Sequence, residues 1–136
     1  MMHDEVGAAL RNMFRRATLA GDASVDADHV RGTFTGRDGE TFTAVPRISD
    51  YGFHSEPMKG ASAILAALGG RSDGLLALGI DDPRKRPSLG PGAVAIYHPA
   101  GHMISLVQQN IRIVSSQPIA VTAPSMTING HTVLTS

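Results

Sequence analysis

The sequence predicts a mainly β protein: a short N-terminal helix, a small OB-like barrel and a C-terminal set of strands that several chains complete together. First, short alternating apolar runs separated by Gly, Pro and Asp recur through residues 18–107, as is typical of small barrels. Second, 15 glycines, two tyrosines, four phenylalanines and no tryptophan among 136 residues indicate many turns and a core of small side chains. Third, residues 108–136 carry apolar clusters that are too sparse to form a core of their own.

The first element, residues 1–17, is predicted to be an amphipathic helix. Apolar residues recur at helical spacing from Val6 to Ala17, which gives about three turns with one apolar stripe. Two interpretations remain open: the helix packs on its own domain, or it docks on a partner subunit.

Residues 18–107 are predicted to form the barrel. A first hairpin has arms at 30–35 and 41–45, joined at Arg37–Gly39, because Asp-Gly accepts the positive φ values of tight turns. Two apolar runs, ASAILAAL and LLALGI, give the next strands. A second hairpin, AVAIYHPAGHMISLV, is expected to turn at Pro99–Gly101.

The tail, residues 108–136, is predicted to be a short triple-stranded β-helix formed by three chains. Pro118, Pro124 and the pair Asn129-Gly130 separate its clusters at positions suited to turns. So few apolar side chains cannot offset the entropy of ordering the tail within one chain. Three copies around one axis would give each short strand one side of a triangular prism. The residues expected to face that axis are Ile111, Ile113, Ile119, Val121, Met126 and Ile128.

Composition excludes several classes of function. Twelve basic and twelve acidic residues balance, so no strong field recruits nucleic acid or an anionic membrane surface. The absence of cysteine excludes disulfides and thiolate chemistry. No apolar run is long enough to span a bilayer, and the start, MMHDEVGAALRNMFRR, does not read as a signal peptide. We therefore expect synthesis in the cytoplasm.

No constellation of catalytic residues emerges, and we predict a protein that is not an enzyme and has no cofactor. His98 and His102 flank a predicted turn, so they are expected to be surface residues rather than metal ligands. Asp81 and Asp82 lead into a basic loop and are expected to form a solvated charge cluster. His131 is expected to be a polar corner residue, and whether three copies hold an ion on a three-fold axis stays open.

Three blocks of the sequence resemble a known family. VPRISDYGFHSEPMKGASAI carries a Tyr-Gly pair, a Ser-x-Pro and a Gly before a small-residue strand; LGGRSDGLLALGIDDPRKRP and LGPGAVAIY follow it. Together they resemble the baseplate assembly protein V family of contractile-tailed phages, which includes the Mu-type central spike proteins. Ala93 stands where an acid is common. The matching motif residues are Asp50, Tyr51, Gly52, Phe53, Ser55, Pro57, Gly60, Asp81, Asp82 and Arg84.

The resemblance implies a homotrimer with an OB-like barrel and an intertwined C-terminal β-helix. It also implies a place in the virion, on the tail axis of the baseplate. The expected partners are the baseplate hub protein, the tail-tube components and, transiently, the host outer membrane, with no nucleic acid. Mu-type spikes carry a His-x-His pair that binds iron, whereas this sequence contains none. A separate tip protein at the C-terminal end, residues 132–136, is therefore also expected.

The spike function has three rivals. OB barrels often bind single-stranded nucleic acid, but that requires a basic groove with stacking aromatic side chains, which this composition disfavours. An assembly adaptor that never touches a membrane differs from a spike only in where its tail points. A small hydrolase or metal enzyme lacks the necessary residues.

Overall fold

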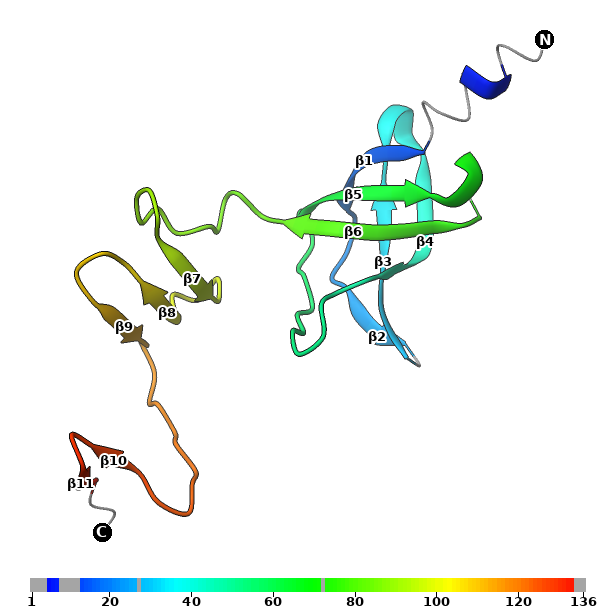
Figure 1. Cartoon of the computed structure of the whole chain (residues 1–136). Helices are drawn as coiled ribbons and strands as arrows, with labels where there is room; N and C mark the ends of the chain where they lie inside the picture. The colour runs from blue at the N-terminus through cyan, green and yellow to red at the C-terminus, as the bar shows by residue number, and fades with distance from the viewer. Residues whose placement is uncertain (1–4, 8–12, 27, 72, 134–136) are drawn as a thin grey trace. The chain divides into compact units, whose positions relative to one another are not determined.

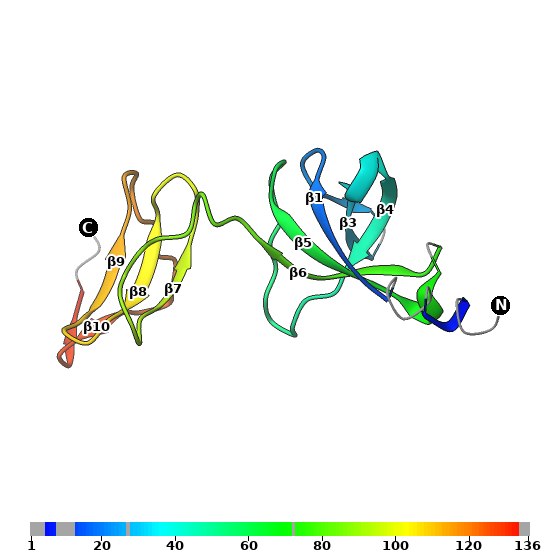
Figure 2. The ribbon, with the colours of Figure 1, turned by 90° about the horizontal axis from the view of Figure 1, so that it is seen from above.

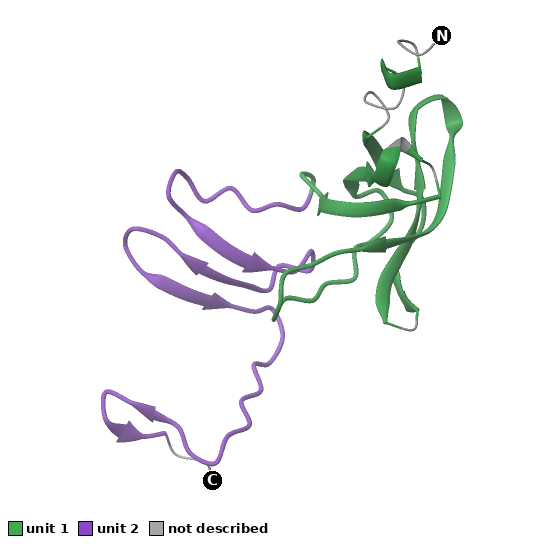
Figure 3. Ribbon diagram, turned by 45° about the vertical axis from the view of Figure 1, so that its right-hand side comes forward, with its two compact units in different colours: residues 1–84 green, residues 85–136 purple. Residues whose placement is uncertain are grey.

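The protein was analysed as a computed structural model, which describes residues 5–7, 13–26, 28–71 and 73–133. The chain divides into two compact units, residues 1–84 and residues 85–136 (Figure 3). The predicted boundary between barrel and tail, at Gln108, lies inside the second unit.

The first unit is a small five-stranded barrel, consistent with an OB-like fold (Figure 1). Its ring runs β1 (Phe14–Leu19), β5 (Ser62–Ala67), β6 (Leu75–Asp81), β4 (Thr41–Arg47) and β3 (His29–Thr35), and β3 returns to β1. Only β4 and β6 pair in parallel, through Arg47 and Ala77; the other neighbours are antiparallel. A short β2 (Ser24–Asp26) extends the sheet beside β3. The closed ring leaves little sheet edge exposed.

The barrel core is made of small side chains around one aromatic ring. Alternate residues of each strand point inward, as the two-residue period of a strand requires. Phe34, Leu19 and Leu65 are almost completely buried and fill the centre. The remaining core residues are five alanines, one valine and one leucine: Ala17, Val45, Ala61, Ala63, Ala67, Leu75 and Ala77.

The predicted β3–β4 hairpin is confirmed. Its turn is a 3-10 segment, Arg37–Gly39, in which Asp38 and Gly39 have φ values of 57° and 76°. A second irregularity lies in β4, where the register with β3 shifts between Gly32 and Phe34. Ala44 occupies this bulge with a φ of 53°, a conformation that favours glycine.

The predicted N-terminal helix does not continue to Ala17. Glu5–Gly7 are helical, residues 8–12 lie outside the described residues, and Phe14 already belongs to β1. The stretch Phe14–Leu19 pairs with β5 over five residues and with β3 at Thr18 and Leu19. These long-range strand pairings outweigh the weak local preference for a helix. A second short 3-10 turn, Leu68–Gly70, joins β5 to β6.

The second unit contains a three-stranded antiparallel sheet (Figure 2). Its strands, in order across the sheet, are β7 (Val94–Tyr97), β8 (Met103–Leu106) and β9 (Ile111–Val114). The predicted hairpin with its turn at Pro99–Gly101 is confirmed as β7 and β8, but it lies in this unit and not in the barrel.

The tail beyond β9 contains one further hairpin, β10 (Thr127–Ile128) and β11 (His131–Thr132). Asn129 and Gly130 form its two-residue turn with φ values of 50° and 75°, as a type I′ turn requires. Ile119–Val121 was expected to form a strand of the prism, but within a single chain it has no strand pairing.

Candidate assembly interface

The most unusual surface of the molecule is one face of the β7–β8–β9 sheet. The strand registers align Val94 with Leu106 and Ile111, and Ile96 with Ile104 and Ile113. Residues two apart on a strand share a face, so both rows lie on the same side of the sheet. These six side chains, termed the aliphatic face, are 43% to 72% exposed in the single chain. A contiguous exposed apolar patch of this kind is typical of a protein–protein interface.

On the opposite side of the sheet, the side chains at the centre are buried or half-buried. Ser105, at its centre, is 1% exposed, and Ala95, Met103 and Val114 are half-buried. The single chain therefore covers the side that carries a serine and leaves the side that carries isoleucine, leucine and valine in contact with water. Such an inversion is costly for an isolated chain, and it makes the aliphatic face a candidate interface.

The tail residues predicted to face a shared axis are exposed as well. Ile111 and Ile113 belong to the aliphatic face, and the other four lie farther along the chain: Ile119, Val121, Met126 and Ile128. All six are 40% to 72% exposed. The structure thus places none of them in a core of the single chain.

The sequence prediction missed four members of this interface: Val94, Ile96, Ile104 and Leu106. Their alternation with smaller or polar residues correctly predicted strands. The same alternation predicted that these strands belong to the barrel, because the pattern alone does not determine which element covers a strand.

The first block of the family motif, Asp50 to Gly60, lies in the loop between β4 and β5, residues 48–61. Asp50 accepts a backbone hydrogen bond from Phe53 at 3.1 Å, and Gly52, inside this turn, has a φ of 86°. Tyr51 and Phe53 project from the turn and are largely exposed. The Tyr-Gly pair in the sequence predicts this turn well. The tyrosine supplies the exposed ring, and the glycine supplies the positive φ that the turn requires.

Other motif residues hold this loop against the barrel. The Arg47 guanidinium donates to the Ser55 carbonyl at 2.8 Å and also contacts the Ser55 hydroxyl. The Pro57 carbonyl accepts a hydrogen bond from the backbone of Ala23 at 2.8 Å. The backbone N–H of Lys59 donates to the Asp22 carboxylate, also at 2.8 Å.

Two motif blocks that are far apart in sequence meet at Gly60. The Arg84 guanidinium makes two hydrogen bonds with the Asp82 carboxylate, at 2.9 and 2.8 Å, and reaches the Lys59 carbonyl at 3.4 Å. A Cβ on Gly60 would lie 2.5 Å from Nη2 of Arg84, and Gly60 has a φ of 93°. The positive φ therefore favours glycine there, and a larger residue would also force the Arg84 guanidinium to shift.

Asp81 and Asp82 do not form a catalytic pair of carboxylates. Asp82 is engaged by Arg84, and its hydrogen bond and negative charge raise the pKa of the Arg84 guanidinium above its usual value. Asp81 ends β6 and lies on the barrel surface. The two carboxylates thus lie in different environments and do not act as a pair.

The histidines form no metal centre among the described residues. The rings of His98 and His102 lie 5.8 Å apart, but each has its own partner: His98 accepts from the backbone of Ala100, and His102 lies 3.0 Å from the Ser115 hydroxyl. His131 is exposed in β11. No cluster of three potential ligands occurs in the part of the chain that is described. Among the same residues, no helix has the length and apolar character to cross a membrane.

Comparison with known proteins identifies a matching family model and relatives of this chain. The family model described as "Bacteriophage Mu Gp45, N-terminal" matches residues 23–84. The chain is 37% identical over 94 residues to the "Baseplate puncturing device gp45" of Escherichia phage Mu, which covers 68% of this chain and 48% of that protein. It is 33% identical over 78 residues to the "Mu-like prophage FluMu protein gp45" of Haemophilus influenzae, covering 57% of this chain and 42% of that protein.

The chain thus spans about half the length of the curated relatives that it matches. Neither relative carries the name of an enzyme, in agreement with the prediction of a non-enzymatic protein. The matched residues contain β2 to β6 and every position of the family motif. The resemblance predicted from the motif is confirmed, and this chain belongs to the family of Mu-type baseplate spike proteins.

Proposed function

We propose that this chain is a structural protein of a contractile phage or phage-like tail baseplate, where three copies form a central spike on the tail axis. The name of the phage Mu relative, a baseplate puncturing device, supports this role. The proposed task is to help puncture the host envelope when the tail contracts.

The aliphatic face is the observation that carries the proposal. Three copies that turn their aliphatic faces toward one axis would remove eighteen branched side chains from water, since each chain contributes six. The exposed residues Ile119, Val121, Met126 and Ile128 would extend the same apolar column along the tail. Two copies would cover the sheet equally well, and the count of three rests on the family resemblance.

The proposed partners follow from the place on the tail axis. They are the hub protein and tail-tube components on one side and, transiently, the host outer membrane on the other, within a virion whose parts are made in the host cytoplasm. The separate tip protein stays a prediction, which imaging of an assembled particle would test by showing a bare or a capped end.

The solution mass of the purified chain tests the proposal directly. We expect three times the chain mass of 14.3 kDa by sedimentation. Ile104 is the best position to perturb, because it pairs with both Ile96 and Ile113 at the centre of the aliphatic face. Ile104→Asp should abolish the trimer, since it places three carboxylates in an apolar column.

A matched control is Gln109→Asp, which adds the same charge in the exposed turn between β8 and β9 and should leave the trimer intact. A folded wild-type monomer at all accessible concentrations would contradict the proposal. A dimer would retain the interface but refute the three-fold spike.

A further inference from the structure

Within the part of the chain that the structure describes, one edge of β1 is only partly paired. Met13 accepts a backbone hydrogen bond from Ala67, and Leu19 donates one to Ala61, so the odd-numbered residues of β1 bond to β5. In an antiparallel pair, the intervening residues point their N–H and C=O groups to the other side. Those of Phe14, Arg16 and Thr18 therefore face away from β5.

On that other side, β3 pairs with β1 only at Thr18 and Leu19. Beyond Thr35 the β3 chain turns away into the hairpin tip, Arg37–Gly39. Among the described residues, no strand pairs with the backbone of Phe14 and Arg16 on this edge. Two N–H and two C=O groups are thus presented in extended geometry, as a template for one further strand.

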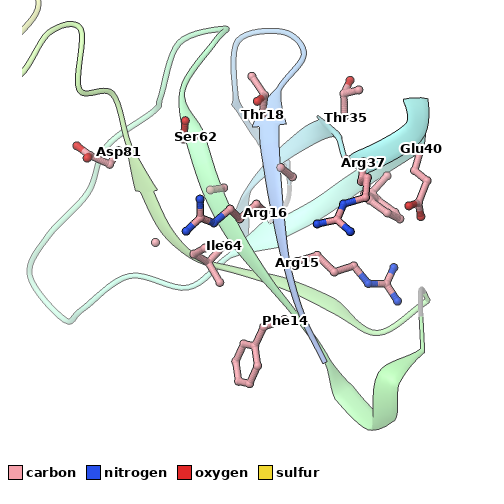
Figure 4. A pocket seen from close by; sticks show the side chains of 15 residues that line it. Phe14, Arg15, Arg16, Thr18, Thr35, Arg37, Glu40, Ser62, Ile64 and Asp81 are labelled. Atoms are coloured by element: carbon pink, nitrogen blue, oxygen red, sulfur yellow. The ribbon is translucent and has the colours of Figure 1, made fainter. Parts of the chain in front are cut away.

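A groove of about 1090 Å³ lies over this edge. Four parts of the barrel line the groove: β1, the outer face of β5, the end of β6 and the tip of the β3–β4 hairpin. Figure 4 shows Arg15, Arg37 and Glu40 on one side of β1, and Arg16, Ile64 and Asp81 on the other. Phe14 and Ile64 are exposed apolar side chains at its rim.

The charges of the groove favour an acidic occupant. Three arginines line it, Arg15, Arg16 and Arg37, against two carboxylates. On the side of the hairpin, where an added strand would lie, Arg15 and Arg37 outnumber Glu40. Arg15 is positioned by Phe42, whose ring centroid lies 5.4 Å from its guanidinium carbon.

We propose that this groove binds an extended acidic peptide from another protein, which adds a strand to β1 at Phe14–Arg16. The backbone edge gives the peptide its register, and the arginines select acidic side chains. This site lies on the barrel and is independent of the aliphatic face of the second unit.

A single-stranded nucleic acid suits the groove less well. Bases have no row of amide groups to pair with the β1 edge. The exposed aromatic side chain of the groove is Phe14, whereas Phe42 is half-buried beneath Arg15, and Glu40 and Asp81 would repel phosphates.

Fluorescence anisotropy with the full chain tests the proposal. The probe is a fluorescein-labelled peptide of alternating glutamate and valine; comparators of equal length are a lysine–valine peptide and oligo(dT). We expect the glutamate peptide to bind, the lysine peptide to bind at least about tenfold more weakly, and salt to reduce the affinity. Arg37→Glu should weaken binding by about tenfold, because it reverses one charge of the wall.

A pair of substitutions separates strand addition from simple charge attraction. Arg16→Ala and Arg16→Pro remove the same charge, but only proline also removes the N–H that faces the groove and is not used by β5. Arg16→Pro should bind about fivefold more weakly than Arg16→Ala, as expected for one lost hydrogen bond. In the unsubstituted chain, hydrogen exchange at the amides of Phe14 and Arg16 should slow when the peptide binds.

Three results would overturn the proposal: equal affinity for the glutamate and lysine peptides, preference for oligo(dT), or unchanged exchange at Phe14 and Arg16 at saturating peptide. Exchange in the unsubstituted chain keeps the test decisive if Arg16→Pro proves poorly folded.

Discussion

The strands of the barrel and of the second unit both alternate between a buried and an exposed face. The two units differ in which face carries the larger apolar side chains. In the barrel, the inward positions of β1, β3 and β5 carry Leu19, Phe34 and Leu65, all 1% exposed or less. In the β7–β8–β9 sheet, the larger aliphatic side chains occupy the exposed face and a serine occupies the buried one. A single chain therefore buries the larger side chains of the barrel, whereas the described residues of the second unit leave the larger side chains of the sheet exposed.

This difference supports the proposal that the barrel folds by itself and that the second unit mediates assembly. The barrel has a closed ring of strands and a contiguous core. The second unit has a sheet of three short strands whose apolar face is not covered. Changes in the barrel core should alter the free energy of unfolding, and changes on the aliphatic face or the tail should alter the oligomeric state.

The largest expected effect is complete loss of assembly from Val121→Asp. Val121 is 63% exposed in the single chain, and in the proposed trimer its three copies would place unpaired carboxylates in an apolar column. Light scattering should report monomers, while the barrel keeps its unfolding midpoint. Thr122→Asp, one residue along, is the control and should remain trimeric. A Val121→Asp trimer with unchanged melting would refute the packing of the tail.

Phe34→Ala should produce the largest change in the stability of the barrel. Phe34 is the largest fully buried side chain, so its truncation should reduce the free energy of unfolding by about 3–5 kcal/mol, measured by urea denaturation. Ile96→Ala on the aliphatic face is the matched truncation. It should weaken assembly but leave unfolding of the barrel nearly unchanged, and an equal loss of barrel stability would remove the distinction between the two units.

Gly60→Ala should destabilise the barrel by about 1–3 kcal/mol, through the positive φ and the contact with Arg84. The two causes separate in an Arg84→Ala background, where only the backbone strain remains and the cost of Gly60→Ala should fall. Thermal or urea unfolding of the four proteins measures this coupling. Equal costs in both backgrounds would show that Arg84 moves away freely.

The smallest expected effect is a gain in stability from Ala44→Gly. The bulge holds Ala44 at a φ of 53°, and glycine relieves that strain, although it also makes the unfolded chain more flexible. We expect a net gain of about 0.5–1 kcal/mol in urea unfolding. Ala63→Gly, in β5 where φ is not positive, should destabilise instead. Equal losses at both positions would argue against strain at the bulge.

Local turn chemistry explains what the sequence predicted correctly. Asp38-Gly39 adopts the positive φ values expected of it, and the strands on either side pair as predicted. Asn129-Gly130 forms a turn at the predicted position, although the β10–β11 pairing around it was not predicted. The strands β5 and β6 followed from compact apolar runs with glycine at their ends. These features depend on residues close together in the chain.

Features that depend on distant partners were less predictable. Phe14–Ala17 fits a helical spacing as well as a strand, and only pairing with β5 and β3 decides the outcome. The contact of Gly60 with Arg84 joins residues that no spacing rule relates, although the family motif contained both. The aliphatic face showed the alternation of a strand, but the sequence does not state what covers it.

The uncovered face of β7–β9 has a consequence for the order of events during synthesis. The barrel strands emerge from the ribosome first and close within one polypeptide, so their rate of closure does not depend on how many chains are present. In the proposed trimer, the aliphatic faces of separate copies must meet by collision, and the rate of that step rises steeply with their concentration. A rapid burst of translation would therefore shorten the interval in which newly made chains are open to misassociation, whereas slow production would prolong it.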